Sequence, residues 1–313
     1  MQYFNIIIQQ IIMLVIYAGI GVLAVKIKLI NHDGLGVLSK LIMKILLPVL
    51  IFTNTINGAT KEEFFSSIPV MYVTIVMYLC LFILSLTIAL IFRMKGNEKN
   101  VFRACTMFGN IGFMGIPIAA ALFPKDGMLY VALFTIIDQL LLWTLGLALT
   151  HPVGEKEQKR SLLAIIKPMI NPATVGVAIA FIAIMFGWNL PPIINGPLTK
   201  LGACATPLAL IYLGGLFCYT DVLSYLKRGE IYCSIIVKML LFPIAFFNVL
   251  SLVPSLNQDI IVFITIFSSL PTMTSIPMFA KSQNSAGEYA AGYIFLTTVC
   301  SIITLPLICI AIG

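Results

Sequence analysis

The sequence predicts an all-α membrane protein in which ten transmembrane helices form two inverted repeats of five. Three observations lead to this fold class. The 313 residues are 60% hydrophobic and 10% charged, with a mean hydropathy of +1.05, whereas soluble domains carry about 25% charged residues. The chain divides into ten apolar runs. An Ile-Pro pair then recurs 160 residues apart, at Ile116–Pro117 and Ile276–Pro277.

Each apolar run is long enough to cross the hydrocarbon core as a helix, which takes about 20 residues. The runs are continuous and do not alternate with polar residues, which excludes a transmembrane β-barrel. The expected spans are residues 4–25, 35–57, 66–92, 101–124, 127–150, 162–186, 193–218, 230–252, 259–280 and 286–311.

The positions of the basic residues predict the orientation, because Lys and Arg concentrate in cytoplasmic loops. With the N-terminus outside, the loops after spans 1, 3, 5, 7 and 9 are cytoplasmic and hold twelve Lys and Arg, while the opposite loops hold only Lys61 and Lys125. We therefore expect a multi-pass protein of the cell membrane with both termini outside. The net charge of +7 then reflects cytoplasmic loops beside a lipid bilayer and predicts no nucleic-acid partner. The first residues resemble no cleaved signal peptide.

The two halves are expected to be repeats that enter the membrane with opposite polarity. Gly127 and Gly287 share the 160-residue offset, and the polar linker 151–161 lies between them. Residues 1–150 would form the first repeat and 162–313 the second. Five spans is an odd number, so the second repeat is inverted, a plan typical of secondary transporters. The alternative is chance recurrence among sixteen prolines.

Spans 4 and 9 are predicted to be broken near their middle. The stretch 109–117 reads GNIGFMGIP, and 268–277 reads SSLPTMTSIP with five hydroxyl side chains. A proline inside a helix removes a backbone hydrogen bond, which lipid tolerates only beside protein or a water-filled cavity. Helix N-termini at such breaks attract anions. The competing interpretation is a pair of kinked helices with small residues at their contact.

Four segments match the motifs of one transporter family. GNIGFMGIP (109–117) is similar to an Asn-x-x-x-Met-Gly-Ile-Pro break, and SSLPTMTSIPMFAKSQN (268–284) to a Leu-Pro-x-x-x-x-Pro-x-x-Phe-Ala-Lys-x-x-Asn segment. INPATVG (170–176) resembles an Asn-Pro opening of the sixth span, and Gln139 with Trp143 a Gln-x-x-x-Trp pair in the fifth. Together they resemble the auxin efflux carrier family, which includes plant PIN proteins and bacterial permeases for malate and related organic acids.

The resemblance implies a secondary transporter that moves a small organic anion, auxin-like or malate-like, across the plasma membrane by an elevator mechanism. It implies that helices 4 and 9 cross at their prolines. Spans 1, 2, 6 and 7 would form a scaffold and the surface of a homodimer, and spans 3–5 and 8–10 a moving transport domain. The implied substrate contacts are Asn110, Gly112, Pro117, Gln139, Asn171, Pro271, Thr272 and Pro277.

Asp138 is the one acid deep in a predicted span, about eleven residues from either end. A charge at that depth costs roughly 2.5–3.5 kcal/mol, so its carboxyl group should face a partner or a wet cavity. It is a candidate for proton coupling; the alternative is an acid that bonds a neighbouring helix. Four lysines in apolar runs are expected to extend along the helices to the membrane surface, namely Lys44, Lys167, Lys200 and Lys238.

An enzyme, a metal site and a bound cofactor are not expected. The seven cysteines form no Cys-x-x-Cys pair and both histidines lie in loops, so neither acid–base catalysis nor metal binding has a candidate at membrane depth. A sodium-coupled symporter of the bile-acid type is the nearest alternative, but it would want clustered side-chain oxygens at the breaks. A transporter-like receptor is a weaker alternative, since no soluble output domain is fused to the chain.

Overall fold

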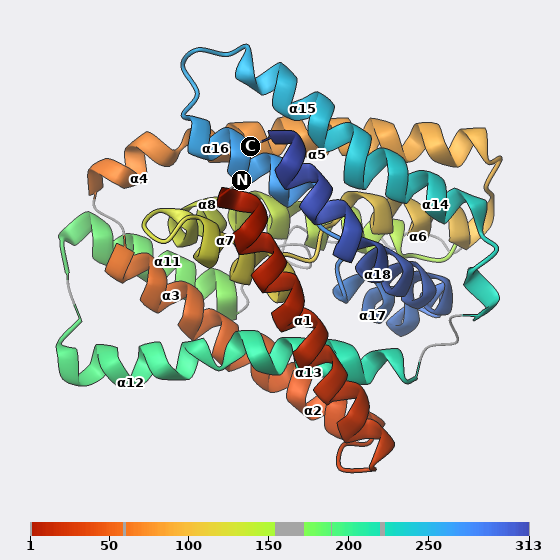
Figure 1. The fold of residues 1–313 in the computed structure, drawn as a ribbon, viewed down its shortest axis with the longest axis horizontal. Coiled ribbons are helices and arrows are strands. Elements are labelled where there is room, and N and C mark those ends of the chain that lie inside the picture. Colours follow the sequence, from red (N-terminus) through yellow and green to blue (C-terminus); the bar gives the residue numbers. More distant parts are fainter. Residues whose placement is uncertain (1, 59–60, 154–171, 189, 220–222, 313) are drawn as a thin grey trace.

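The computed structural model describes residues 2–58, 61–153, 172–188, 190–219 and 223–312, and in this part the chain is almost wholly helical (Figure 1). Five helical stretches are long and apolar enough to cross a membrane: Lys61–Ile91, Gly127–Leu149, Pro192–Phe217, Gly229–Ser251 and Gly287–Ile312. Three shorter apolar helices are Val15–Lys26, Ile111–Leu122 and Gln258–Ser268. The molecule is therefore a multi-pass membrane protein, and its division into ten spans and two inverted repeats stays a prediction.

The helices of the first half often continue one another with little or no connection. They are α1 (Gln2–Lys26), α2 (His32–Leu41), η1 (Ile42–Leu46), α3 (Leu47–Gly58), α4 (Lys61–Ser67), α5 (Pro69–Ile91), α6 (Gly96–Met107), η2 (Ile111–Gly115), α7 (Ile116–Leu122), α8 (Gly127–Leu141), η3 (Leu142–Gly146) and α9 (Leu147–Leu149). Here η1, η2 and η3 are π-helical turns, which recur at functional sites in helices.

The helices of the second half also often continue one another with short connections. Its elements are α11 (Pro172–Phe186), α12 (Pro192–Ala203), α13 (Ala205–Phe217), the 3₁₀ turn η4 (Leu223–Tyr225), α14 (Gly229–Ile236), the π-helical turn η5 (Val237–Leu241), α15 (Phe242–Ser251), α16 (Gln258–Ser268), α17 (Ser275–Ser282) and α18 (Gly287–Ile312).

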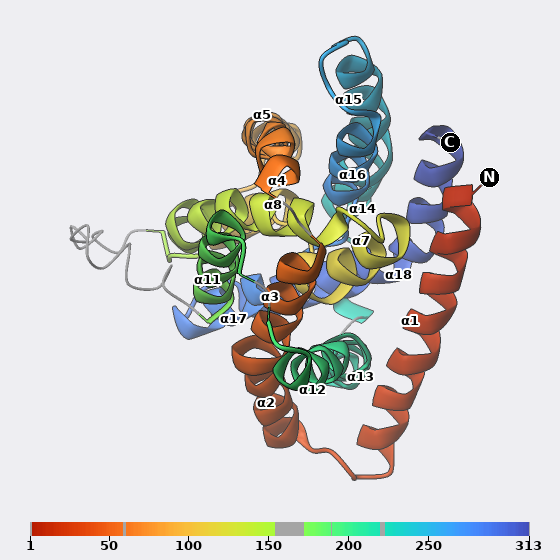
Figure 2. The same ribbon diagram turned by 90° about the vertical axis from the view of Figure 1, so that its left-hand side faces the viewer.

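One group of helices is built around α3 and α13. Helices α11 and α12 pack on α3, and α1 packs along α13 (Figures 1 and 2). The backbones of α1 and α13 touch because glycines face each other: a Cβ on Gly21 would lie 2.0 Å from the Ile211 carbonyl oxygen, and one on Gly214 would lie 2.0 Å from that of Ala18. Small residues allow this close approach of apolar helices.

A second group surrounds the two broken spans. Helix α5 packs on α6 and α8, α16 packs on α15 and α18, and α17 packs on α18. Its core is aromatic, with the ring of Phe267 lying 4.0 Å from that of Phe263 and 5.2 Å from that of Phe134. The division into a scaffold and a moving domain stays a prediction.

The two glycines at the 160-residue offset occupy equivalent places. Gly127 begins α8, and a Cβ there would lie 2.5 Å from the carbonyl oxygen of Ala119 in α7. Gly287 begins α18, and a Cβ there would lie 3.0 Å from the backbone nitrogen of Lys281 in α17. In both halves a glycine lets the helix after the break start directly against the half-helix before it.

The sequence predicted breaks at the Ile-Pro pairs, but the helices are broken elsewhere. The chain leaves the helical conformation earlier, between Met107 and Ile111 and between Ser268 and Ser275. Pro117 follows a π-helical turn inside a continuing helix, and Pro277 is the third residue of α17, where a missing N–H has no helical acceptor to lose. These two prolines therefore lie in the half-helices that follow the breaks.

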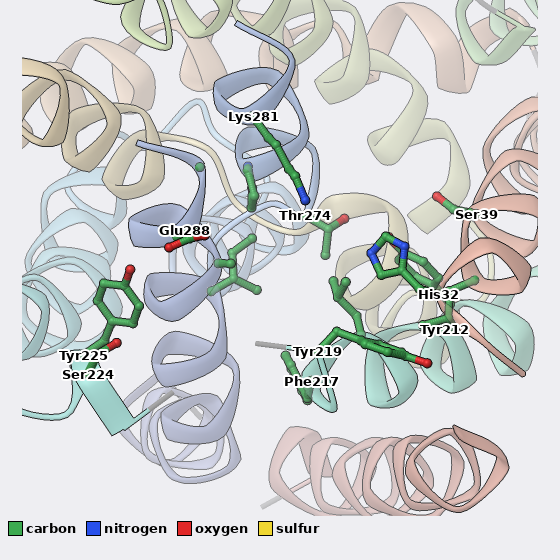
Figure 3. A pocket seen from close by; sticks show the side chains of 17 residues that line it. His32, Ser39, Tyr212, Phe217, Tyr219, Ser224, Tyr225, Thr274, Lys281 and Glu288 are labelled. Atoms are coloured by element: carbon green, nitrogen blue, oxygen red, sulfur yellow. The ribbon is translucent and has the colours of Figure 1, made fainter. Parts of the chain in front are cut away.

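A cavity of about 590 Å³ lies between the two groups of helices. Helices α2 and α13 line one side of it, and α17 and α18 line the other (Figure 3). The cavity therefore lies where the group built on α3 and α13 meets the group that contains the broken spans.

Candidate functional site

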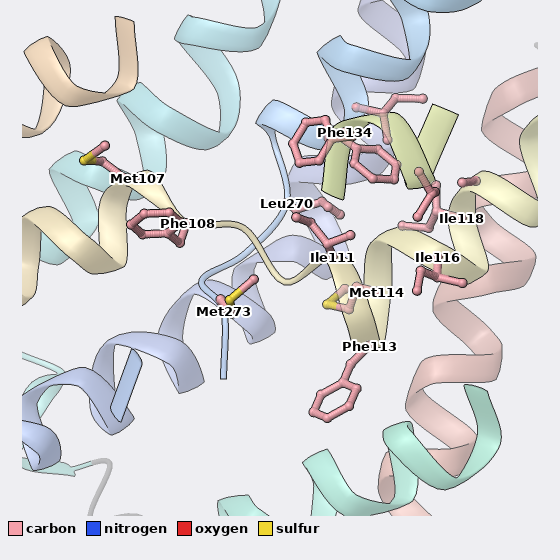
Figure 4. Close-up of a cluster of buried hydrophobic side chains, with 14 of the residues drawn as sticks. Met107, Phe108, Ile111, Phe113, Met114, Ile116, Ile118, Phe134, Leu270 and Met273 are labelled. Carbon is pink, nitrogen blue, oxygen red and sulfur yellow. The ribbon is translucent and has the colours of Figure 1, made fainter. Parts of the chain in front are cut away.

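Two extended segments, 108–110 and 271–273, cross and pair with each other at the breaks. The Asn110 backbone N–H donates to the Pro271 carbonyl oxygen at 2.7 Å, and the Met273 N–H donates to that of Phe108 at 2.9 Å. Gly109 and Thr272 thus form an isolated antiparallel bridge, and Figure 4 shows Phe108 and Met273 on the two crossing segments. The helices cross at this bridge, which lies beside Pro271 in the second segment, as expected, but before Pro117 in the first.

Thr272 fixes the crossing to two further helices. Its hydroxyl donates to the Cys105 carbonyl oxygen in α6 at 2.8 Å, and its backbone N–H donates to the Thr297 hydroxyl of α18 at 3.3 Å. Buried backbone groups need such partners. Pro271 and Thr272, both predicted as substrate contacts, therefore build the crossing through their own backbone and hydroxyl groups.

Asn110 ends the first extended segment and starts the following helical turn. Its side-chain oxygen accepts from the Phe113 N–H at 3.3 Å, so it caps η2. The side chain is 1% exposed, and its Nδ2 has no hydrogen-bond partner among the described residues. An amide nitrogen left unpaired in a core costs free energy. It also leaves two N–H donors available for an anion.

A carboxylate cluster, consisting of Tyr78, Asp138, Gln139 and Trp143, lies beside the crossing. The Tyr78 hydroxyl and the Gln139 amide (3.0 Å) both donate to the Asp138 carboxyl group, and the Trp143 ring N–H donates to the Gln139 oxygen at 3.1 Å. The Tyr78 ring is 5.5 Å from that of Phe108. Asp138 therefore has partners, and Gln139 belongs to its cluster.

Lys238 does not extend to the membrane surface, although the sequence predicted that it would. It is 3% exposed, and its ammonium group donates to the Leu270 carbonyl oxygen at the second break. Lys44 and Lys200 are exposed, as expected, and Lys167 lies outside the described residues. The prediction used only the distance of each lysine from the end of its span. That distance does not tell whether the side chain faces lipid or the protein interior, so Lys238 could not be distinguished from the others.

Gly112 and Pro117, two further predicted contacts, take no part in the crossing bonds. Gly112 is partly buried, and a Cβ there would lie 3.4 Å from Leu47 of α3. Pro117 is buried in α7. Asn171 lies outside the described residues.

The cavity reaches one end of the crossing through α17. Of the predicted contacts in the described part of the chain, Pro277 is the one that lines it, next to Thr274. Its polar lining is mixed in charge, as Figure 3 shows, and includes His32, Ser39, Tyr212, Lys281 and Glu288. The described residues contain no group of three or more His, Cys, Asp or Glu that could hold a metal ion.

The sequence matches the membrane transport protein family (Mem_trans) over residues 6–309. The chain belongs to this family. This confirms the resemblance to auxin efflux carriers seen in the motifs, and it makes the chain a membrane transporter and not an enzyme.

Three relatives are similar to this transporter along most of its length. A protein of Rhizobium meliloti (strain 1021) named "Putative malonate transporter" is 27% identical over 299 residues, which cover 88% of this chain and 87% of the relative. An uncharacterised transporter of Methanothermobacter thermautotrophicus is 22% identical over 308 residues and 96% of both chains. Another, from Methanocaldococcus jannaschii, is 23% identical over 293 residues, covering 89% and 90%.

Proposed function

We propose that this transporter is a secondary carrier for a small organic anion bearing one or two carboxylate groups. The observation that carries the proposal is the buried Asn110 amide at the crossing, whose Nδ2 has no partner among the described residues. A carboxylate would accept from this group. The name of the Rhizobium relative, which refers to malonate, supports a dicarboxylate as the first candidate substrate.

The helix ends at the crossing add positive potential. Both η2 and α17 begin there, at Ile111 and Ser275, and the N-terminus of a helix favours anions through its unpaired N–H groups and its dipole. Two such ends close together supply a site for a carboxylate without a buried arginine. The nearby cavity also presents the basic side chain of Lys281.

The position of the cavity supports an alternating-access mechanism in which the structure faces the cytoplasm. His32, Tyr219 and Lys281 line the cavity and lie in or beside loops that the basic residues assign to the cytoplasm. An elevator-like shift of the second helix group would carry the crossing past α3 and α13. The Phe113 and Tyr212 rings, 5.6 Å apart, lie at that sliding contact.

Uptake by the purified protein in liposomes tests this function. The panel is a set of mono- and dicarboxylates including malonate, with an imposed membrane potential or pH gradient. We expect saturable uptake of at least one carboxylate, and at least about a tenfold loss in Asn110→Ala, since a hydrogen bond to a charged group contributes about 1.5–3 kcal/mol.

Asn248→Ala is the matched control, because the exposed Asn248 amide donates only within its own helix, to the Ile244 carbonyl oxygen. It should transport at the wild-type rate, and both variants should keep the wild-type gel-filtration profile. Absence of uptake for every carboxylate would refute the function. Unchanged rates in well-folded Asn110→Ala would remove Asn110 from the site.

A further inference from the structure

Lys238 is a cationic side chain in the middle of a membrane-spanning stretch. It lies nine residues after the start and thirteen before the end of Gly229–Ser251, which is apolar enough to span the membrane. Only 3% of it is exposed. Charged groups at that depth are costly and are retained where they serve a partner or a pathway. The ion pairs found in the described part of the chain do not include Lys238.

The partner of Lys238 is a backbone carbonyl at the second break. Its ammonium group donates to the oxygen of Leu270, just after α16 ends at Ser268. The C-terminal end of a helix carries partial negative charge, and in secondary transporters such ends and unwound carbonyls bind the coupling cation. The ammonium group therefore occupies a place suited to a bound monovalent cation.

This contact adjoins the proposed substrate site directly. Leu270 precedes Pro271, whose carbonyl oxygen accepts the Asn110 backbone N–H at 2.7 Å. On the other side of Pro271, the Thr272 hydroxyl donates to the Cys105 carbonyl oxygen at 2.8 Å. The ammonium group is thus anchored to the segment that positions Asn110.

The 160-residue offset relates Lys238 to a residue of the first half. Subtracting the 160-residue offset from Lys238 gives Tyr78, whose hydroxyl donates to Asp138 in the carboxylate cluster. Equivalent positions of the two halves thus each send a donor to a polar group beside the crossing. In the first half the donor is neutral and its acceptor is a carboxyl group; in the second the donor is a cation and its acceptor is a carbonyl.

We propose that the Lys238 ammonium group is the resident cation of the crossing, so that the carrier binds and moves its anionic substrate without Na⁺. The inference rests on the proposed function. Lys238 is a positioning residue: it holds the Leu270–Pro271 peptide in place for Asn110, and its charge offsets that of the substrate carboxylate. A purely structural lysine would need its hydrogen bond but not its charge.

The test compares uptake into liposomes in Na⁺ buffer and in Na⁺-free choline buffer. Wild-type uptake should be equal in both. Lys238→Met, which keeps the length but has neither the charge nor an N–H donor, should lose at least about tenfold, in line with the loss of a buried charged donor. Lys238→Ala should lose as much in choline, and added Na⁺ or methylammonium, which fit the vacated space, should restore part of it. Lys44→Met, an exposed lysine in the π-helical turn η1, is the matched control and should transport normally.

Three results would overturn the inference: a wild-type requirement for Na⁺, wild-type rates in Lys238→Met, or folded Lys238→Ala that no small cation rescues. Gel filtration and thermal unfolding establish whether the variants are folded. If they are not, uptake by the wild-type protein in Na⁺ buffer and in choline buffer decides the inference. The two proposals fail differently. A wild-type protein that moves no carboxylate in either buffer refutes the carrier function, whereas one that moves a carboxylate only with Na⁺ refutes only the role of Lys238.

Discussion

At the residue scale, the buried carboxyl group beside the crossing is paired with hydrogen-bond donors. Asp138 shows this most clearly, because its two carboxyl oxygens accept from Tyr78 and Gln139 on different helices. Asp138 and Asn110 could be selected from the sequence because each is polar within an apolar run. Tyr78 could not, since tyrosine is common in such runs and its partner lies sixty residues away.

Tyr78→Phe should lower the stability of the protein. The change removes one of the two donors to a buried carboxyl group, which costs about 1–3 kcal/mol. Thermal unfolding in detergent measures the effect. Tyr72→Phe, an exposed tyrosine on the same helix α5, should unfold at the wild-type temperature. Equal unfolding temperatures for the two variants would mean that the Tyr78 bond does not hold Asp138.

Asp138→Asn tests whether this carboxyl group couples transport to protons. Asparagine keeps the shape but cannot titrate, so uptake should become much less dependent on pH. The measurement is the initial rate of uptake into liposomes across pH 5 to 8. Asp259→Asn, at the exposed start of α16, should retain the wild-type profile. An unaltered profile in Asp138→Asn would exclude proton coupling through this residue.

At the element scale, the breaks in the two helices were predictable but their positions were not. The repeated Ile-Pro pairs marked the correct spans, because proline is disfavoured inside a helix. The chain nevertheless accommodates Pro117 after a π-helical turn and Pro277 in a first turn. The crossing itself is set by backbone pairing between Gly109 and Thr272, a long-range contact that no local pattern reveals.

Gly109→Val should separate the crossing segments. A Cβ at Gly109 would already lie 3.2 Å from that of Leu270, so a branched side chain must displace the facing segment and disturb Asn110. We expect uptake to fall by at least about tenfold, since small misplacements of a binding group have large effects. Gly196→Val, at a position with open space around it, should transport normally. Full activity of Gly109→Val would show that the close crossing is not required.

At the scale of the whole molecule, two groups of helices meet around a cavity that reaches the crossing. The sequence indicated a membrane protein through its composition, and the family motifs implied the grouping of the spans. Composition and periodicity could not locate the cavity, because its lining comes from three parts of the chain that are distant in sequence: α2, α13 and the α17–α18 pair. Figure 2 shows how far the α12–α13 pair lies from α15 and α16.

Cysteine labelling tests the predicted orientation of this cavity. In a background without native cysteines, Ala291→Cys places a thiol on the cavity wall in α18. A membrane-impermeant maleimide should label it from the cytoplasmic side, and the transported carboxylate should slow the labelling. Ile193→Cys, at an exposed position beginning α12, should react only from outside. The opposite pattern would show that the orientation is inverted.

We propose that the crossing is the binding site of a carrier that exposes it alternately to the two sides of the membrane. Counterflow tests this most directly: liposomes containing the protein are loaded with unlabelled carboxylate and diluted into a trace of the labelled compound. A carrier predicts transient accumulation of label above equilibrium, which Asn110→Ala should abolish. Label that only equilibrates, at a rate proportional to its concentration, would indicate a channel and contradict the account.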